Sequence, residues 1–205
     1  MARLGASAVT AVDPVPHFVE ACRARHTGVD VRQAPAEQLP FDDGEFDAAG
    51  AQLVFHFVSD PARAVAEMAR VVRPGGVVAA TVWDFAEGMQ MLRAFWDAAL
   101  SVDPQAPDEA QVMRFGAPGQ LAGLSGDAGL SQVDEATMSV ASPYRDFDEL
   151  WTSLLAGIGP AGAYAVALPE DTRADLRRAL HEQLGSPAGP FTLTALAPAA
   201  RATVP

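Results

Sequence analysis

The sequence predicts an α/β fold in which helices cover both faces of a mostly parallel β-sheet. Apolar strands alternate with amphipathic helices over the first 84 residues, and a proline or a capping acid stands where the helices begin. Several of the strands are apolar throughout, which is typical of a parallel sheet covered on both sides. At 205 residues the chain is long enough for one substantial domain, so we expect a single domain over 1–205.

The first elements form a strand–helix–strand unit. The stretch ASAVTAVD predicts a buried strand that ends on Asp13, and MARLG before it predicts the last turn of a helix closed by glycine. The stretch VPHFVEACRARH predicts a short helix with Phe18, Val19 and Cys22 on its apolar face. Alternating valines in GVDVRQA predict the next strand. A turn-rich connection leads from there to an apolar strand over 46–57.

The stretch SDPARAVAEMARVV predicts the clearest helix of the chain. Asp60 caps it and Pro61 takes its first position, where a missing N–H costs nothing. The residues Val65, Met68 and Val72 lie on one face at helical spacing. The tetrapeptide RPGG then predicts a turn, and VVAATVWD predicts another buried strand rich in β-branched residues.

The second half of the chain is expected to be mainly helical. Helices are predicted in GMQMLRAFWDAALSV, APGQLAGLSGDAGL, DFDELWTSLLAGI and PEDTRADLRRALHEQL, and a strand in SQVDEATMSV. The terminal GPFTLTALAPAARATVP predicts a closing strand, which Pro198 kinks or places at a sheet edge.

Composition and charge exclude several classes of function. All 14 basic residues are arginine and the net charge is −12, which argues against a nucleic-acid partner and excludes a catalytic or P-loop lysine. No stretch approaches the roughly 18 apolar residues that cross a bilayer, so no membrane partner is expected. The four histidines are scattered, so no metal site is predicted. The single Cys22 suits a reducing, cytoplasmic location.

Five stretches in one order carry a family resemblance: VTAVDP, AEQLPFDDGEFDAA, QLVFHFVSDP with the helix after it, RPGG with the strand after it, and the closing strand. Together they resemble the small-molecule branch of the class I S-adenosylmethionine-dependent methyltransferases, closely over residues 5–84. The resemblance implies a Rossmann-like sheet, S-adenosyl-L-methionine as cofactor and a small-molecule methyl acceptor. It also implies a cofactor-binding half over 1–84 and a C-terminal half over 85–205, with an inserted helical lid and the final strands.

The chain departs from this family at its start. The acid at the tip of the family's second strand normally follows a glycine-rich loop by roughly 20 residues, but only 12 residues precede Asp13. The family's first strand and glycine loop are therefore expected upstream of Met1, which is either an internal methionine taken as a start or the mark of a genuine truncation. Without the central strand, two interior strands would expose their edges, which predicts poor solubility or a homo-oligomer.

The resemblance implies cofactor contacts in three places, where successive strands end. Asp13 would accept hydrogen bonds from the ribose diol, although an acid there also serves nicotinamide cofactors or merely begins a turn. Many relatives carry an adenine-binding acid where this chain has Pro35, so backbone near Ala36 or the Glu37 side chain would replace it, unless Glu37 is simply solvated. The expected cofactor-binding residues are Asp13, Pro14, Ala36, Glu37, Gln52 and Leu53.

One residue is the candidate catalyst. A neutral His56 at the mouth of the site could take a proton from an attacking hydroxyl or amine, although a lone histidine at a strand end is more often structural. Apolar residues of the later helices either line a substrate pocket or form ordinary core, the second reading being favoured for most: Met89, Met91, Phe95, Trp96, Trp151 and Tyr164.

Two other classes of function stay open at this point. The chain could be a non-catalytic fragment or pseudoenzyme that acts as an interaction module through its open sheet edges. It could also be a fragment of a nucleotide-cofactor oxidoreductase, which Asp13 alone would permit, although the HFVSDP and RPGG stretches argue against it.

Overall fold

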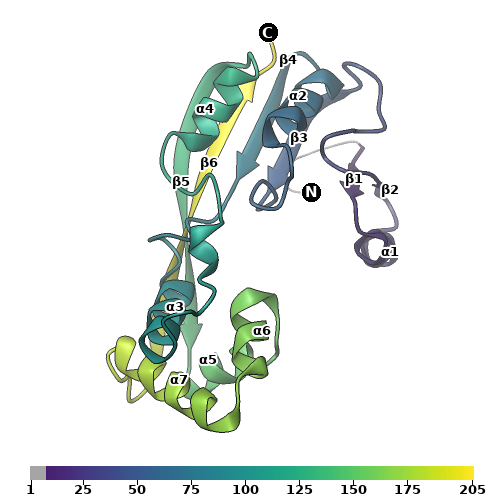
Figure 1. The fold of residues 1–205 in the computed structure, drawn as a ribbon. Helices are drawn as coiled ribbons and strands as arrows, with labels where there is room; N and C mark the ends of the chain where they lie inside the picture. The colour runs from purple at the N-terminus through teal and green to yellow at the C-terminus, as the bar shows by residue number, and fades with distance from the viewer. Residues whose placement is uncertain (1–7) are drawn as a thin grey trace. The chain divides into compact units, whose positions relative to one another are not determined.

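The computed structural model describes residues 8–205, which divide into two compact units. Unit 1 comprises residues up to 80 together with 121–135 and 200–205, and unit 2 comprises 81–120 and 136–199. The long strands β5 and β6 contribute residues to both units. In chain order the elements are β1 (Thr10–Asp13), α1 (Pro16–Arg25), β2 (Asp30–Gln33), β3 (Phe46–Gln52), α2 (Pro61–Val71), β4 (Val72–Thr81), α3 (Gln90–Val102), the 3₁₀ turn η2 (Glu109–Gln111), α4 (Gln120–Asp127), β5 (Ser131–Tyr144), α5 (Phe147–Leu154), α6 (Gly159–Ala167), α7 (Glu170–Gln183) and β6 (Phe191–Thr203) (Figure 1).

The strands form two sheets. β1 pairs in parallel with β2, with Thr10 opposite Asp30 and Asp13 opposite Gln33. The other sheet has the order β3-β4-β6-β5. Within residues 8–205, no strand pairs with β1 on the side away from β2, or with β3 on the side away from β4. These two open edges are the ones that the resemblance predicts, and the predicted helix tail over residues 1–5 lies outside the described residues.

The local signals around α2 give the helix that they predict. Asp60 Oδ1 accepts a hydrogen bond from the Arg63 backbone N at 3.0 Å, so Asp60 caps the helix as expected. Val65 and Met68 are buried on its apolar face. By contrast, α1 buries only Val19, and Phe18 of its predicted apolar face is 54 % exposed.

The predicted turn at RPGG is wrong, because β4 runs through all four residues. Gly75 takes a φ of +76° and its N–H donates to Val204 O, while Val204 N donates to Gly76 O, so the tetrapeptide pairs with the end of the chain. A Cβ on Gly76 would lie 2.6 Å from Asp47 O and 2.4 Å from Val72 Cγ1. Glycine lets the backbone of β4 approach β3 at this point.

The expectation that Pro198 places the last strand at a sheet edge is also wrong, since β6 lies between β4 and β5. The carbonyl of Pro198 accepts from Val82 N at 3.0 Å, so the proline still takes part in the β4–β6 ladder. The partners Gly75–Val204, Val82–Pro198 and Asp84–Leu196 run in opposite directions, which makes this pairing antiparallel.

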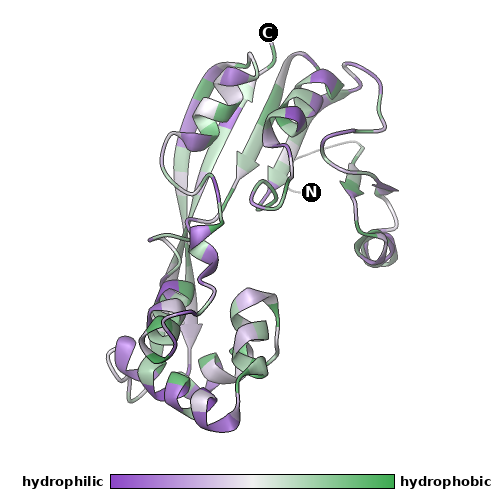
Figure 2. Ribbon diagram, viewed as in Figure 1, coloured by the Kyte–Doolittle hydropathy of each residue, from purple (hydrophilic) through white to green (hydrophobic). Residues whose placement is uncertain are grey.

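Unit 2 has a helical core formed by α3, α5, α6 and α7. Phe95, Trp96, Leu150, Leu176 and Leu180 are all nearly inaccessible to solvent. Helix α7 is largely hydrophilic over its length and buries only its two leucines named above (Figure 2).

Of the six apolar residues considered for the lid, Phe95, Trp96 and Trp151 are buried, and Met91 and Tyr164 pack against the same cluster. This agrees with the reading of most of them as ordinary core. No single helix in the described part of the chain is long and apolar enough to cross a membrane. Helices α5 and α6 reach that length and apolar composition only when they are counted together, and the chain bends by 88° between them.

Candidate functional site

Asp13 ends β1, the point at which parallel strands present ligand-binding residues. Its side chain is half-buried, and Oδ1 accepts a hydrogen bond from Val15 N at 2.8 Å. Pro14 is exposed, and its carbonyl accepts from Gln33 Nε2 at 3.1 Å. A carboxylate has room for about four hydrogen bonds, so the turn orients Asp13 and leaves it capacity for a ligand diol.

The Glu37 side chain forms hydrogen bonds within the protein. Its Oε1 accepts hydrogen bonds from Ser59 N at 3.0 Å and from Asp60 N at 3.2 Å, and its backbone oxygen accepts from Arg63 Nε at 3.2 Å. Glu37 therefore ties the loop after β2 to the turn before α2, and the solvated alternative does not hold. Ala36 beside it is half-buried. The adenine contact predicted for these two residues stays a prediction.

The same loop is anchored by an ion pair on α2 that sequence reasoning missed. Glu67 is buried, accepts from Leu39 N at 2.8 Å, and pairs with Arg70 through Oε1 and Oε2 at 2.8 and 2.9 Å. Arg70 also donates to the backbone oxygens of Leu39 and Phe41 and pairs with Asp43. One arginine thus holds three points of the loop on the helix.

The hydrogen bond from Arg70 is the main reason that the pKa of Glu67 falls from 4.5 to about 2; burial opposes this effect, and the Leu39 N–H and the charges of Arg70 and Arg63 support it. Glu67 stands on the otherwise apolar face of α2 beside Met68. An acidic residue on the apolar face of the predicted helix is the sequence feature that could have predicted this anchor.

β3 ends at Gln52, so the strand predicted over 46–57 is shorter than predicted, and Gln52 lies at the strand end as the resemblance implies. Leu53 follows with a φ of +60°, in the left-handed region that leucine rarely adopts. Such strain costs about 1–3 kcal/mol and is concentrated at ligand-binding and active sites. Within residues 8–205, no hydrogen bond joins Gln52 or Leu53 to Asp13.

His56 lies in the turn after β3 and is 6 % exposed. Its ring contacts Phe57 at a centroid separation of 6.0 Å, and Phe57 itself is 70 % exposed. The surrounding chain therefore covers most of the imidazole. Its catalytic role stays a prediction.

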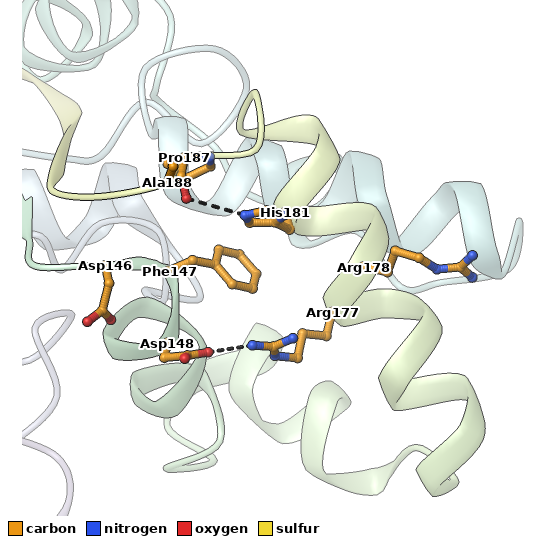
Figure 3. Close-up of a pocket in the computed structure, with 8 residues that line it drawn as sticks. All are labelled: Asp146, Phe147, Asp148, Arg177, Arg178, His181, Pro187 and Ala188. Carbon is orange, nitrogen blue, oxygen red and sulfur yellow. Dashed lines mark hydrogen bonds and ion pairs between the residues drawn. The ribbon is translucent and has the colours of Figure 1, made fainter.

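A shallow pocket of unit 2 lies between α5 and α7 (Figure 3). Charged groups of the pocket already pair with each other: Arg177 forms an ion pair with Asp148, and the Arg177 guanidinium lies 5.3 Å from the Phe147 ring centroid. His181 Nε2 lies 3.4 Å from Pro187 O. Because these partners are internal, the pocket is not the candidate site. No cluster of metal-ligating side chains occurs in residues 8–205 either.

Residues 1–80 match the family described as the methyltransferase domain. An uncharacterised methyltransferase of Mycobacterium tuberculosis is 44 % identical over 68 residues, which are 33 % of this chain and 28 % of that protein. The chain therefore matches less than a third of the length of this curated relative. Over residues 1–80 the match agrees with the resemblance to methyltransferases that the sequence motifs carry.

Solved structures show the same fold over nearly the whole chain. A candidate methyltransferase from Bacillus halodurans aligns with a TM-score of 0.58 at 15 % identity, covering 97 % of this chain and 84 % of that one. An N-methyltransferase from Haemonchus contortus, in complex with phosphomonomethylethanolamine and S-adenosylhomocysteine, aligns with a TM-score of 0.57 at 15 % identity, covering 100 % and 46 %. The predicted α/β, Rossmann-like fold class is confirmed.

Proposed function

We propose that this chain, whose residues 1–80 match the methyltransferase domain family, is a class I S-adenosylmethionine-dependent methyltransferase that binds S-adenosyl-L-methionine at the carboxyl ends of β1 and β3 and methylates a small molecule. The observation that carries the proposal is Asp13, a half-buried carboxylate oriented by Val15 N at the tip of a parallel strand. The strained backbone of Leu53 at the tip of β3 supports it.

Each predicted residue has one role in this proposal. Asp13, beside Pro14, accepts hydrogen bonds from the ribose hydroxyls. The backbone of Ala36 and Glu37 meets the adenine, in a loop that Arg70 and Glu67 hold in place. This assignment leaves the amino-acid end of the cofactor to the final residues of β3.

Gln52 and Leu53 provide that contact through backbone groups at the strand end. His56 takes the proton that the acceptor releases. When bound, the cofactor supplies a methyl group on a sulfonium, and the chain's own part is to align the acceptor in line with that bond and to exclude water. A reaction of this kind needs positioning more than a dedicated set of acids and bases.

The acceptor class is argued from the resemblance, and the Haemonchus contortus protein, which binds a small phosphorylated amine, supports it. The acidic chain, with a net charge of −12, does not favour a nucleic-acid acceptor. The single Cys22, which has no internal disulfide partner, suits the cytoplasm as its location.

The experiment is a calorimetric titration of residues 1–205 with S-adenosylhomocysteine. Asp13→Asn keeps an oxygen for Val15 N but removes the charge, and we expect it to weaken binding about 10- to 100-fold, because hydrogen bonds to charged groups are worth about 1.5–3 kcal/mol. Asp30→Asn, an exposed acid at the other end of the neighbouring strand, is the matched control and should bind as the wild type.

Two outcomes would count against the proposal. Equal affinities for Asp13→Asn and the wild type would remove Asp13 from the site. A wild-type chain that melts cooperatively but takes up no cofactor would favour the alternative of a non-catalytic interaction module with open sheet edges.

A further inference from the structure

Glu37 connects two segments that both belong to the proposed site. Its Oε1 accepts hydrogen bonds from Ser59 N at 3.0 Å and from Asp60 N at 3.2 Å, and these partners lie 22 and 23 positions further along the chain. They are the last two residues of the connection 53–60, which joins β3 to α2. One carboxylate oxygen therefore fixes the C-terminal end of this connection to the loop after β2.

The connection 53–60 carries the features at the end of β3 that the proposed function uses. It begins with the left-handed backbone of Leu53 and contains the buried His56. Phe57 N donates to Val54 O at 2.9 Å, which closes a turn around His56. Glu37 binds the far end of the same connection. A group that fixes this end restricts the positions that the turn around His56 can take.

The loop that contains Glu37 is itself fixed along the length of α2. Three residues of the helix bind alternate residues of this loop: Arg63 binds Glu37, Glu67 binds Leu39, and Arg70 binds Leu39 and Phe41. Residues three and four apart on a helix share a face, so the loop runs along one side of α2. The loop is therefore a fixed base from which the Glu37 side chain reaches the residues that precede the helix.

We propose that Glu37 is a positioning residue of the methyl-transfer site. Its carboxylate holds the connection 53–60, with His56, against the loop that meets the adenine, and it leaves the adenine contact to the loop backbone. This inference rests on the proposed function, which assigns the loop to the adenine and His56 to the acceptor. Because hydrogen bonds join the two segments directly, order gained in the loop on cofactor binding passes to the connection 53–60.

Amide hydrogen exchange, followed by NMR, tests this role. Glu37→Ala keeps the loop backbone but removes the acceptor of Ser59 N and Asp60 N, so exchange at both amides should accelerate about 10- to 100-fold. Excess S-adenosylhomocysteine should slow this exchange in the wild type and leave it unchanged in Glu37→Ala. Glu45→Ala is the matched control, because Glu45 Oε2 also accepts a backbone hydrogen bond, from Asp42 N at 2.9 Å, but only within the loop. It should exchange at both amides as the wild type does.

A second variant covers the case in which Glu37→Ala unfolds, which circular dichroism would show. Glu37→Gln keeps the length of the side chain and an oxygen for both amides. Its exchange at Ser59 and Asp60 should be faster than in the wild type, because the charge is lost, and slower than in Glu37→Ala.

A calorimetric titration separates positioning from a direct adenine contact. The wild type and Glu37→Ala are titrated with S-adenosylhomocysteine and with S-inosylhomocysteine, in which an oxo group replaces the adenine amino group. A positioning role weakens the binding of both ligands by the same factor, about 2- to 30-fold, because the two changes are then independent. A side-chain contact to the amino group would weaken only the binding of S-adenosylhomocysteine.

Three results would overturn the inference. Wild-type exchange at Ser59 and Asp60 in both Glu37 variants would show that the carboxylate does not hold the connection. A loss of affinity confined to S-adenosylhomocysteine would make Glu37 an adenine ligand and leave the proposed function intact. A wild type that binds neither ligand would overturn the proposed function itself, and with it this role of Glu37.

Discussion

Replacing Glu67 by glutamine tests whether the loop after β2 is held by the ion pair with Arg70. The glutamine keeps the shape of the side chain and an oxygen for Leu39 N, but it loses the charge that Arg70 pairs with. The pKa of Glu67 in the folded protein is about 2, against 4.5 as its ordinary value. At about 1.4 kcal/mol per pH unit, the ionised carboxylate therefore contributes about 3 kcal/mol to stability at neutral pH.

The sign of this contribution fixes its pH dependence. Because the folded-state pKa is lowered, the unfolded chain binds the extra proton first as the pH falls. The contribution of Glu67 is complete above its unfolded pKa of 4.5 and is lost progressively as the pH falls toward about 2. At pH 7, Glu67→Gln should lower the free energy of unfolding by about 3 kcal/mol, or the melting temperature by about 6–12 °C for a chain of this size.

Urea unfolding at pH 7 and at pH 3 measures both quantities. The wild type should lose more stability than the variant between the two pH values, so their unfolding curves should converge at low pH. Glu182→Gln, a change of an exposed glutamate at the end of α7, is the control for a surface charge and should change stability by less than about 0.5 kcal/mol. A difference below about 0.5 kcal/mol for Glu67→Gln at pH 7 would refute the role given to the pair.

Three further changes follow from the structure. Asp60→Ala removes the cap of α2 and should lower the free energy of unfolding in urea by about 1 kcal/mol. An unchanged free energy of unfolding would mean that the cap does not stabilise the protein. Gly76→Ala forces a Cβ to within 2.6 Å of Asp47 O and should cost about 1–3 kcal/mol, and an unchanged melting temperature would contradict that close approach. Burial raises the pKa of Glu109, so the ionised form of this side chain destabilises the fold as the pH rises through that pKa. Glu109→Gln keeps an acceptor for the Trp96 N–H and should therefore raise the melting temperature at pH 8. A lower melting temperature for this variant would contradict the argument.

The candidate site was predictable from the sequence as far as its positions along the chain. Asp13 ends its strand as expected, because a turn-forming proline follows it, whereas the apolar pattern after Gln52 predicted a strand that continues to residue 57. What Glu37 contacts could not be predicted, since its partners Ser59 and Asp60 lie more than 20 residues away in sequence. The helix α6 was also missed, because glycines and a proline in GPAGAYAVA obscure its pattern.

The sequence by itself determined the alternation of strands and helices, the similarity to methyltransferase domains over residues 1–80 and the start of α2 at its capping acid. These depend on neighbours a few positions away, so a linear pattern records them. Tertiary structure decided that Pro198 lies on an interior strand, that RPGG extends β4 and that Arg70 holds the loop after β2. Each of these depends on which distant backbone groups need hydrogen-bond partners, and that is settled only when the strands and helices pack together.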